Sequence, residues 1–357
     1  MEIGIVGLPN VGKSTLFNAL TGAAAAASNF PFTTIDPNVG VVPLPAERLT
    51  HLGEYFSSKK VTPAGIRFVD IAGLVKGASQ GEGLGNKFLS HIRAVDAIAH
   101  VVRCFKDPDV INVLGKLDAG EAADVIETEL LLADLQQTEK ALDKLQGPVR
   151  SGDKKAKERL EILEALLAGF KEGRSARSQN VPADVQLEQG FLTGKPVVFV
   201  ANTDETGPDP VLLAALEERA KKENATVVSL CAKIEAEIVQ LPPEERAAYY
   251  EAAHVTTPGL TALATAGKKL LQLITFLTAG PEETRAWLIP EGTKAPKAAG
   301  KIHTDIERGF IRAEIYTYDY FKQHGSTKTL QEKGLISVEG KDYTMKDGDV
   351  VYFRFNV

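Results

Sequence analysis

The sequence predicts an α/β protein in which helices cover both faces of a parallel sheet. Short, almost continuously apolar segments recur along the chain at residues 3–6, 39–42, 66–70, 97–105, 196–201 and 226–230. Such segments are typical of strands buried on both faces, and the stretches between them have helical periodicity. After about residue 275 aromatic and β-branched residues alternate with polar ones. This change predicts a second, smaller α+β or β-grasp-like module.

Composition and charge exclude several classes of protein. Of 357 residues, 44% are hydrophobic and 25% charged, which excludes a mostly disordered chain. The 41 Lys and Arg against 47 Asp and Glu give a net charge of −6, so any nucleic-acid contact must be local. Cys104 and Cys231 are the only cysteines, which favours a reducing compartment over a disulfide framework. The N-terminus lacks a signal peptide and no apolar run is long enough to span a membrane; we therefore expect a cytoplasmic monomer without a membrane partner.

The first strand leads directly into the strongest motif. Residues 7–14 read GLPNVGKS and fit the pattern G-x-x-x-x-G-K-[ST], between a predicted strand and a helix predicted over 13–21. Gly7 and Gly12 let backbone N–H groups surround phosphate oxygens, and the helix N-terminus adds a positive dipole end.

This loop predicts a site for a nucleoside triphosphate. Lys13 would place a charge on the β- and γ-phosphates, and Ser14 would offer a hydroxyl to Mg²⁺. Around these two residues we expect nucleotide contacts from Asn10, Val11, Gly12, Lys13, Ser14 and Thr15.

The strand predicted over 66–70 ends in a second phosphate-sensing motif. Asp70 begins the sequence DIAG and can hold a metal-bound water, while Gly73 can present its N–H to the γ-phosphate. The next residue is Leu74, where many GTPases carry a glutamine that orients the attacking water. The four glycines within 77–85 predict a switch segment that the γ-phosphate orders. The leucine therefore favours a slow or partner-stimulated enzyme.

A further metal ligand is expected between the first helix and the next strand. Residues 30–37 read FPFTTIDP, and a threonine hydroxyl there can join the Mg²⁺ ligands when triphosphate is bound. Thr33 and Thr34 both qualify by residue type, and spacing does not choose between them.

The segment between residues 105 and 196 is too long for one crossover helix. Leucines and a threonine step by four and three residues at 131, 135, 138, 142 and 145, and apolar residues step likewise at 160, 163, 167 and 170. Gly147-Pro148 and Ser151-Gly152 supply the break. We predict a helical hairpin, as an antiparallel coiled coil, with basic residues at or near its tip that are candidates for contact: Arg150, Lys154, Lys155, Lys157 and Arg159.

The predicted strand 196–201 is followed by NTDE, residues 202–205, where GTPases carry N-K-x-D to read guanine. Thr203 replaces the lysine, and Glu205 displaces the carboxylate by about one methylene. A site that depends on paired hydrogen bonds loses discrimination steeply when one is lost, so the change weakens guanine specificity and permits ATP. We expect base-side contacts from Asn202, Thr203, Glu205 and Cys231, the last at the start of the loop sequence CAK.

Taken together, these motifs resemble the YchF/Obg-like ATPase family of P-loop proteins. The resemblance runs nearly end to end and rests on the stretches GLPNVGKST (7–15), NFPFTTIDPN (29–38), DIAGLVKGAS (70–79), GEGLGNKF (81–88), HVVRCF (100–105), RAW (285–287) and AAGKIHTD (298–305). It implies an α/β P-loop NTPase fold of the Obg-type G domain, with a helical coiled-coil insertion and a C-terminal β-grasp TGS domain. The implied domains are residues 1–255, with the insertion at 121–190, and 275–357.

The resemblance also implies an activity and a partner. These are ATP binding and hydrolysis with ATP preferred over GTP, and association with the ribosome or ribosomal RNA. The C-terminal basic residues Lys294, Lys297, Lys301 and Lys328 are candidates for that contact and fit a solvated surface equally well. Family pattern favours Thr34 over Thr33 as metal ligand. Asn112 occupies the place where family members often carry a histidine, so the catalytic set would be Lys13, Gly73 and Asn112. Asn10 resembles an asparagine that binds K⁺ in related hydrolases.

Three other functions fit parts of the same pattern. An Obg-type GTPase would bind GTP more tightly than ATP. A nucleotide-gated RNA- or ribosome-binding adaptor with negligible turnover would explain Leu74 and Asn112. A small-molecule kinase would need an acceptor site, of which the sequence has no signature.

Overall fold

The computed structural model describes residues 1–26, 38–71, 84–253 and 255–356. Thr33, Thr34, Gly73 and Leu74 lie outside these residues, as does most of the glycine-rich segment 77–85. The chain forms two compact units. The first comprises Met1–Gly22, Pro37–Gly40 and Arg67–Ala266, and the second comprises Ala23–Asp36, Val41–Ile66 and Gly267–Val357.

The six-stranded sheet of the first unit has the order β2-β4-β1-β5-β6-β7. Its strands are β1 (Glu2–Gly7), β2 (Val39–Pro43), β4 (Gly65–Asp70), β5 (Ala97–Arg103), β6 (Val197–Asn202) and β7 (Thr226–Leu230). The pairs β4–β1, β1–β5, β5–β6 and β6–β7 are parallel. Every residue of β5 and β6 is buried, as expected for strands covered on both faces. All six predicted strands are therefore confirmed, although the one predicted over 97–105 ends at Arg103.

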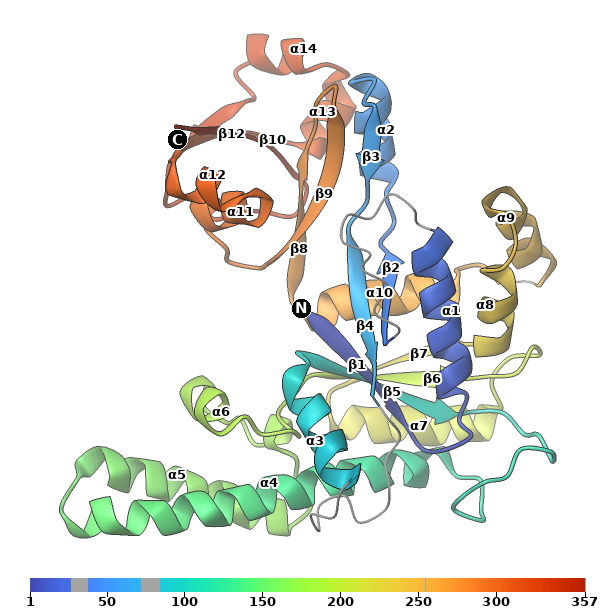
Figure 1. The fold of residues 1–357 in the computed structure, drawn as a ribbon, viewed down its shortest axis with the longest axis vertical. Coiled ribbons are helices and arrows are strands. Elements are labelled where there is room, and N and C mark those ends of the chain that lie inside the picture. The colour runs from blue at the N-terminus through green and yellow to red at the C-terminus, as the bar shows by residue number, and fades with distance from the viewer. Residues whose placement is uncertain (27–37, 72–83, 254, 357) are drawn as a thin grey trace. The chain divides into compact units, whose positions relative to one another are not determined.

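Helices connect and cover these strands (Figure 1). They are α1 (Lys13–Ala26), α3 (Leu84–Ala94), α4 (Ala119–Arg150), α5 (Lys154–Lys171), α6 (Ala183–Gln189), α7 (Pro210–Lys222), α8 (Ala232–Ile238), α9 (Pro243–Ala252) and α10 (Gly259–Leu270), with a 3₁₀ turn at Ala176–Ser178. The helices α4 and α7 pack against each other, α4 also contacts β5, and α7 contacts β6 and β7. One helical layer of the sheet is thus built from both.

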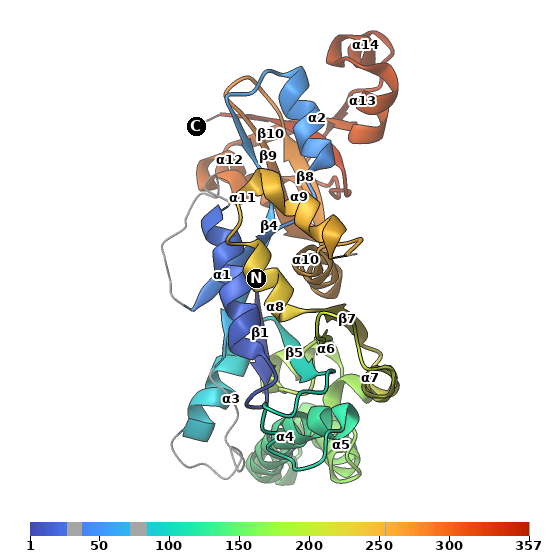
Figure 2. The ribbon, with the colours of Figure 1, turned by 90° about the vertical axis from the view of Figure 1, so that its right-hand side faces the viewer.

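The predicted helical hairpin is confirmed. The helices α4 and α5 lie side by side, and Figure 1 shows that they extend away from the sheet, whereas Figure 2 views them nearly along their axes. The expected break at Gly147-Pro148 is wrong, because α4 continues through Pro148 to Arg150. The chain reverses at Gly152, whose φ of 87° suits glycine, and the Asp153 carboxylate accepts from two backbone N–H groups that begin α5.

The hairpin has its own apolar core. On α5 the buried residues include Leu163, Leu166 and Phe170, against which Leu135 and Leu142 of α4 are partly buried. We predicted Leu167 in place of Leu166; the latter faces the core and the former is half-buried.

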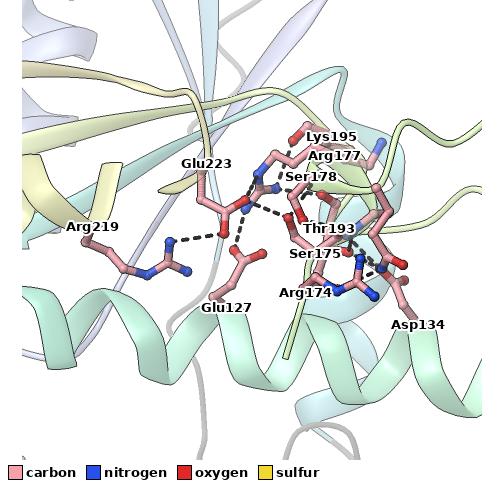
Figure 3. A network of polar contacts seen from close by, with 12 residues as sticks. Glu127, Asp134, Arg174, Ser175, Arg177, Ser178, Thr193, Lys195, Arg219 and Glu223 are labelled. Atoms are coloured by element: carbon pink, nitrogen blue, oxygen red, sulfur yellow. Dashed lines mark hydrogen bonds and ion pairs between the residues drawn. The ribbon is translucent and has the colours of Figure 1, made fainter. Parts of the chain in front are cut away.

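Buried ions fasten the base of the hairpin to the α/β core (Figure 3). Arg177 lies between Glu127 of α4, at 2.6 Å, and Glu223 at the end of α7, at 2.8 Å. Its Nη1 also donates to the carbonyls of Thr193 and Lys195, in the segment that leads into β6. The start of α4 and the segment after α5 are thereby held to the end of α7 and to the segment before β6.

A second carboxylate fixes the same segment. Asp134 of α4 accepts from the backbone N–H groups of Leu192 and Thr193, both at 2.8 Å, and from the Thr193 hydroxyl at 2.7 Å. Burial raises the pKa of Asp134 to about 6, although these three donors oppose the shift. The carboxylate therefore remains mostly ionised at neutral pH.

The second unit is built on a mixed sheet of order β11-β10-β12-β8-β9-β3. Its strands are β3 (Lys60–Thr62), β8 (Leu273–Thr278), β9 (Glu283–Pro290), β10 (Phe310–Thr317), β11 (Ser337–Glu339) and β12 (Asp349–Phe355), and its helices are α2 (Glu47–Tyr55), α11 (Ala295–Ile302), α12 (Thr304–Arg308), α13 (Tyr318–His324) and α14 (Thr327–Glu332). The alternation of aromatic and β-branched residues with polar ones after residue 275 falls on β9, β10 and β12.

The two units differ from the expected domain ranges most extensively at residues 41–66. Residues 41–66 were expected in the first domain, but they belong to the second unit, where β3 pairs in parallel with β9. Leu49 and Leu52 of α2 pack in the same apolar cluster as Leu277 and Phe321. Burial of this apolar helix face accounts for the assignment. The boundary near the C-terminus falls inside α10, between the expected limits of 255 and 275.

Candidate functional site

The GLPNVGKS loop connects the end of β1 to the start of α1. Two of its residues have positive φ, 65° at Asn10 and 90° at Gly12. A Cβ on Gly7 would lie 3.0 Å from the Val101 carbonyl, and one on Gly12 would collide with the Asn202 amide. Close packing therefore favours glycine at both positions, and the positive φ of the turn adds a second reason at Gly12 alone.

Lys13 and Asp70 meet at the carboxyl ends of two neighbouring strands. Lys13 follows β1, Asp70 ends β4, and these strands are paired. The Lys13 Nζ lies 2.5 Å from Asp70 Oδ1, and both side chains are largely buried. Ser14 and Thr15 are exposed at the N-terminus of α1. The sequence prediction that the two motifs share one site is consistent with this geometry.

A cavity of about 570 Å³ opens beside the loop. It is lined by three groups of residues: Gly7–Asn10 with Gly12–Thr15, Phe105–Asp107 with Val110, and Asn202–Glu205 with Cys231–Lys233. The volume suits a small-molecule ligand of nucleotide size. The phosphate-type loop and the NTDE sequence, 190 residues apart in the chain, therefore line one cavity.

Asn202 lines this cavity, and its side chain is hydrogen-bonded to two neighbouring segments. Its side chain is buried, its Nδ2 donates to the Val11 carbonyl at 2.9 Å, and its Oδ1 accepts from the Ala232 N–H at 3.0 Å. The amide thus ties the GLPNVGKS loop to the start of α8. It shapes the cavity by joining its two walls.

The rest of the NTDE sequence forms the rim of the cavity. Thr203 is buried, and its backbone N–H donates to the Leu230 carbonyl. The Asp204 carboxylate accepts from the Thr206 backbone and hydroxyl and so folds the turn. The Glu205 side chain is exposed and lies 2.6 Å from Lys233 Nζ. Cys231 is half-buried next to this pair, and burial raises the pKa of its thiol.

Arg103 is a structural residue of the site that sequence reasoning missed. It is buried at the end of β5, and its guanidinium donates to the carbonyls of Phe105, Asp107 and Val110 at 2.8–3.1 Å. Its Cζ also lies 4.8 Å from the centre of the Phe105 ring. One arginine therefore shapes the third wall, and the only sequence signal for it was its place in the HVVRCF stretch.

Asn112 does not line the main cavity. Its amide donates to the Lys116 carbonyl at 2.6 Å, and its Oδ1 accepts from the Leu114 N–H. It lies with Asn10 beside a separate space of about 20 Å³. Asn10 Nδ2 donates to the Ile111 carbonyl in the same loop. The catalytic role of Asn112 stays a prediction.

His100, the histidine nearest in sequence, is a core residue. It is buried on β5 against Phe199, and burial, with the charges of Arg219 and Arg177, lowers its pKa to about 3. It is therefore neutral at physiological pH.

Two features are absent from the part of the chain that the structure describes. Among the residues that the structure describes, no three or more His, Cys, Asp or Glu side chains gather where they could hold a metal ion. Within the same residues, no helix combines the length and apolar character that crossing a membrane requires.

Comparison with known sequences gives a consistent result over the whole chain. The chain is 50% identical over 360 residues to the "Ribosome-binding ATPase YchF" of Pasteurella multocida, covering 100% of this chain and 99% of the relative. It is 47% identical to the protein of the same name in Bacillus subtilis, with 100% of both chains covered. The chain belongs to the YchF family.

Family models and solved structures agree with membership in the YchF family. Residues 2–140 match the family described as "50S ribosome-binding GTPase", and residues 273–356 match the YchF-GTPase C-terminal family, described as "Protein of unknown function (DUF933)". The structure of the Schizosaccharomyces pombe YchF GTPase covers 99% of this chain at 34% identity and a TM-score of 0.87. A GTP-binding protein from Pyrococcus horikoshii, at 21% identity and a TM-score of 0.63, shares the fold. The first unit thus has the α/β fold of P-loop GTPases.

Proposed function

We propose that this YchF-family chain is a ribosome-binding ATPase that binds ATP with Mg²⁺ and prefers it to GTP. The observation that carries this proposal is the single cavity lined by both the GLPNVGKS loop and the altered NTDE rim. Relatives about 50% identical over the full chain are named ribosome-binding ATPases. Others carry the word GTPase in their names, so the choice of base needs its own test.

The donors around Lys13 fit a magnesium nucleotide. Ser14 and Asp70 offer hard oxygen ligands, and Mg²⁺ usually keeps several waters and uses few protein ligands. Thr34, outside the described residues, would complete the set. Lys13 and Asp70 neutralise each other at 2.5 Å. When the ligand binds, Lys13 would turn to the phosphates and Asp70 to the waters of the metal, which supplies charge stabilisation at the phosphates.

Calorimetry of the purified chain with Mg²⁺ and either ATP or GTP tests nucleotide binding and base preference. We expect saturable ATP binding and weaker GTP binding. Replacing Lys13 with alanine should weaken ATP binding by about 10- to 100-fold, because charge-assisted hydrogen bonds to phosphate are lost. Tighter binding of GTP than of ATP would instead establish an Obg-type GTPase.

Hydrolysis needs a group that orients water, and Leu74 cannot do this. We propose Lys13, Gly73 and Asn112 as the catalytic set. Asn112 would have to release the Lys116 carbonyl before it could reach a ligand. Asn10 retains its Oδ1 as a ligand for K⁺. The rate of ATP hydrolysis should therefore rise when K⁺ replaces Na⁺.

The proposed role of Asn112 gives a separate prediction. An Asn112→Ala variant should hydrolyse ATP more slowly with unchanged ATP affinity.

The Asn112 side chain is hydrogen-bonded within its own loop. This favours a second candidate function, that of a nucleotide-gated ribosome-binding adaptor with negligible turnover. Single-turnover assays with and without ribosomes separate the two functions. An adaptor would bind ribosomes in an ATP-dependent way without phosphate release, whereas the proposed ATPase releases phosphate faster on the ribosome.

Ribosome contact is proposed at two basic regions. At the hairpin tip Arg150, Lys154, Lys155 and Lys157 are exposed, whereas Arg159 is paired with Asp184 and Glu188. In the second unit Lys301 and Lys328 are exposed, Lys294 donates to Asp342 and Thr344, and Lys297 pairs with Glu307.

Because both regions are basic, we expect them to bind phosphate groups of the ribosome through a salt-sensitive contact. A Lys154→Glu/Lys155→Glu/Lys157→Glu variant should sediment less with ribosomes, and Lys140→Glu/Lys144→Glu on the shaft of the same hairpin is its control. Equal losses in both variants would remove the tip from the contact. The coiled-coil and TGS names, a cytoplasmic location and a monomeric state stay predictions.

A further inference from the structure

One ion pair at the rim of the nucleotide cavity has no role in the function proposed so far. Glu205 follows β6, and Lys233 lies in the first turn of α8; both line the cavity. Lys233 Nζ lies 2.6 Å from Glu205 Oε1, and the side chains are 67% and 56% exposed. The pair is therefore accessible to a ligand and cheap to open.

Glu205 stands at the position where GTPases carry the guanine-reading aspartate of N-K-x-D. Guanine offers two adjacent donors, N1–H and the 2-amino group, which a free carboxylate can accept together. Adenine has a lone pair at N1 and no such pair of donors. A carboxylate already paired with an ammonium group is a poorer acceptor, and the ammonium itself presents only donors.

We propose that Lys233 is a specificity-determining residue, which disfavours guanine by occupying Glu205. This inference rests on the proposed nucleotide function and concerns only the choice of base. Lys233 has one other carboxylate in its electrostatic surroundings, that of Glu237, which accepts from the Tyr249 hydroxyl at 3.1 Å. Glu205 also raises the pKa of Lys233, so that the lysine stays charged in the physiological range.

The same cavity supplies a matched control. Lys106 lines another part of the cavity, is similarly exposed, and pairs with Asp209 at 2.7 Å. Replacing either lysine with alanine removes one positive charge from the lining of the cavity. A general weakening of triphosphate binding should therefore occur in both variants, whereas only Lys233→Ala frees Glu205.

The test measures dissociation constants of ATP and GTP, each with Mg²⁺, for the full-length chain. Lys233→Ala should raise the affinity for GTP relative to ATP by about fivefold, the size expected from one exposed ion pair. Lys106→Ala should change both affinities by the same factor. Adding Glu205→Gln to Lys233→Ala should abolish the relative gain for GTP, because the freed carboxylate is gone.

The outcomes separate this inference from the proposed function. If the wild-type chain binds neither nucleotide, the proposed function fails and the inference with it. If it binds nucleotide but Lys233→Ala shifts both affinities equally, or the gain survives Glu205→Gln, the inference alone is wrong. Thermal unfolding of each variant verifies that the fold is intact.

Discussion

Two polar residues, Asn202 and Arg103, determine the shape of the cavity. The Asn202 amide donates to the Val11 carbonyl and accepts from the Ala232 N–H. The Arg103 guanidinium donates to three carbonyls of the neighbouring loop. Asn202 thus joins two walls of the cavity and Arg103 shapes the third, so that a ligand meets a preformed site.

Gly12 gives a prediction at this scale. An alanine there would adopt φ near 90° and press its Cβ against the Asn202 amide, which would displace the loop. Gly12→Ala should weaken ATP binding by at least about tenfold, near 1.4 kcal/mol. Titration calorimetry measures the change.

Gly173→Ala is the control for that experiment. Gly173 has a φ of 81°, but a Cβ there meets no atom within 4 Å, so it adds backbone strain without the collision. If Gly173→Ala weakens ATP binding as much as Gly12→Ala does, backbone strain at large and not the contact with Asn202 explains the loss.

At the residue scale, the sequence could predict what a local motif contains. Lys13 and Asp70 follow strand ends in recognisable patterns, and the structure brings them together. The bonds of Asn202 and Arg103 depend on where distant carbonyls lie, which no local pattern records. Asn112 was carried over by resemblance, and its amide is engaged in its own loop.

At the scale of elements, the hairpin is fastened by buried charge, and Asp134 offers the sharpest test. Both of its oxygens accept from backbone N–H groups. An asparagine has one oxygen, so its amide nitrogen would face an N–H donor. Asp134→Asn should lower the free energy of unfolding by about 2 kcal/mol or more, because a buried donor loses its partner.

Urea unfolding followed by circular dichroism measures this loss. The same substitution at Asp143, which is exposed further along α4, is the control and should change stability by less than about 0.5 kcal/mol. Similar stability of the two variants would show that the Asp134 carboxylate does not hold the segment before β6.

The elements themselves were largely predictable, because buried strands and leucine spacings are local signals. Pro148 misled because proline usually ends or kinks a helix, whereas α4 continues for two residues beyond it, to Arg150. The strand β3 was missed because three residues with one buried side chain carry no periodicity. Its place is set by β9, more than 200 residues later in the chain.

At the scale of the whole molecule, the second unit combines segments from near the start of the chain with its C-terminal segment. Leu49 and Leu52 of α2 are fully buried there with Leu277 and Phe321. A chain truncated after Ala266 would expose these leucines to water. We expect it to aggregate, and size-exclusion chromatography with a dye that binds apolar surface should detect this.

A Leu49→Gln/Leu52→Gln version of the truncated chain is the matched comparison. It should remain more dispersed than the truncation alone, since the exposed face becomes polar. If both truncated forms behave as well-dispersed species, the apolar face of α2 does not depend on the C-terminal segment.

The early position of α2 and β3 in the chain has a consequence for biosynthesis. Translation releases residues 41–66 long before residues 267–357 exist, and domains otherwise tend to fold in order as they emerge. The nascent polypeptide therefore carries the apolar face of α2 and the unpaired strand β3 through most of its elongation. During that interval we expect these segments to be open to chaperones that bind exposed apolar surface.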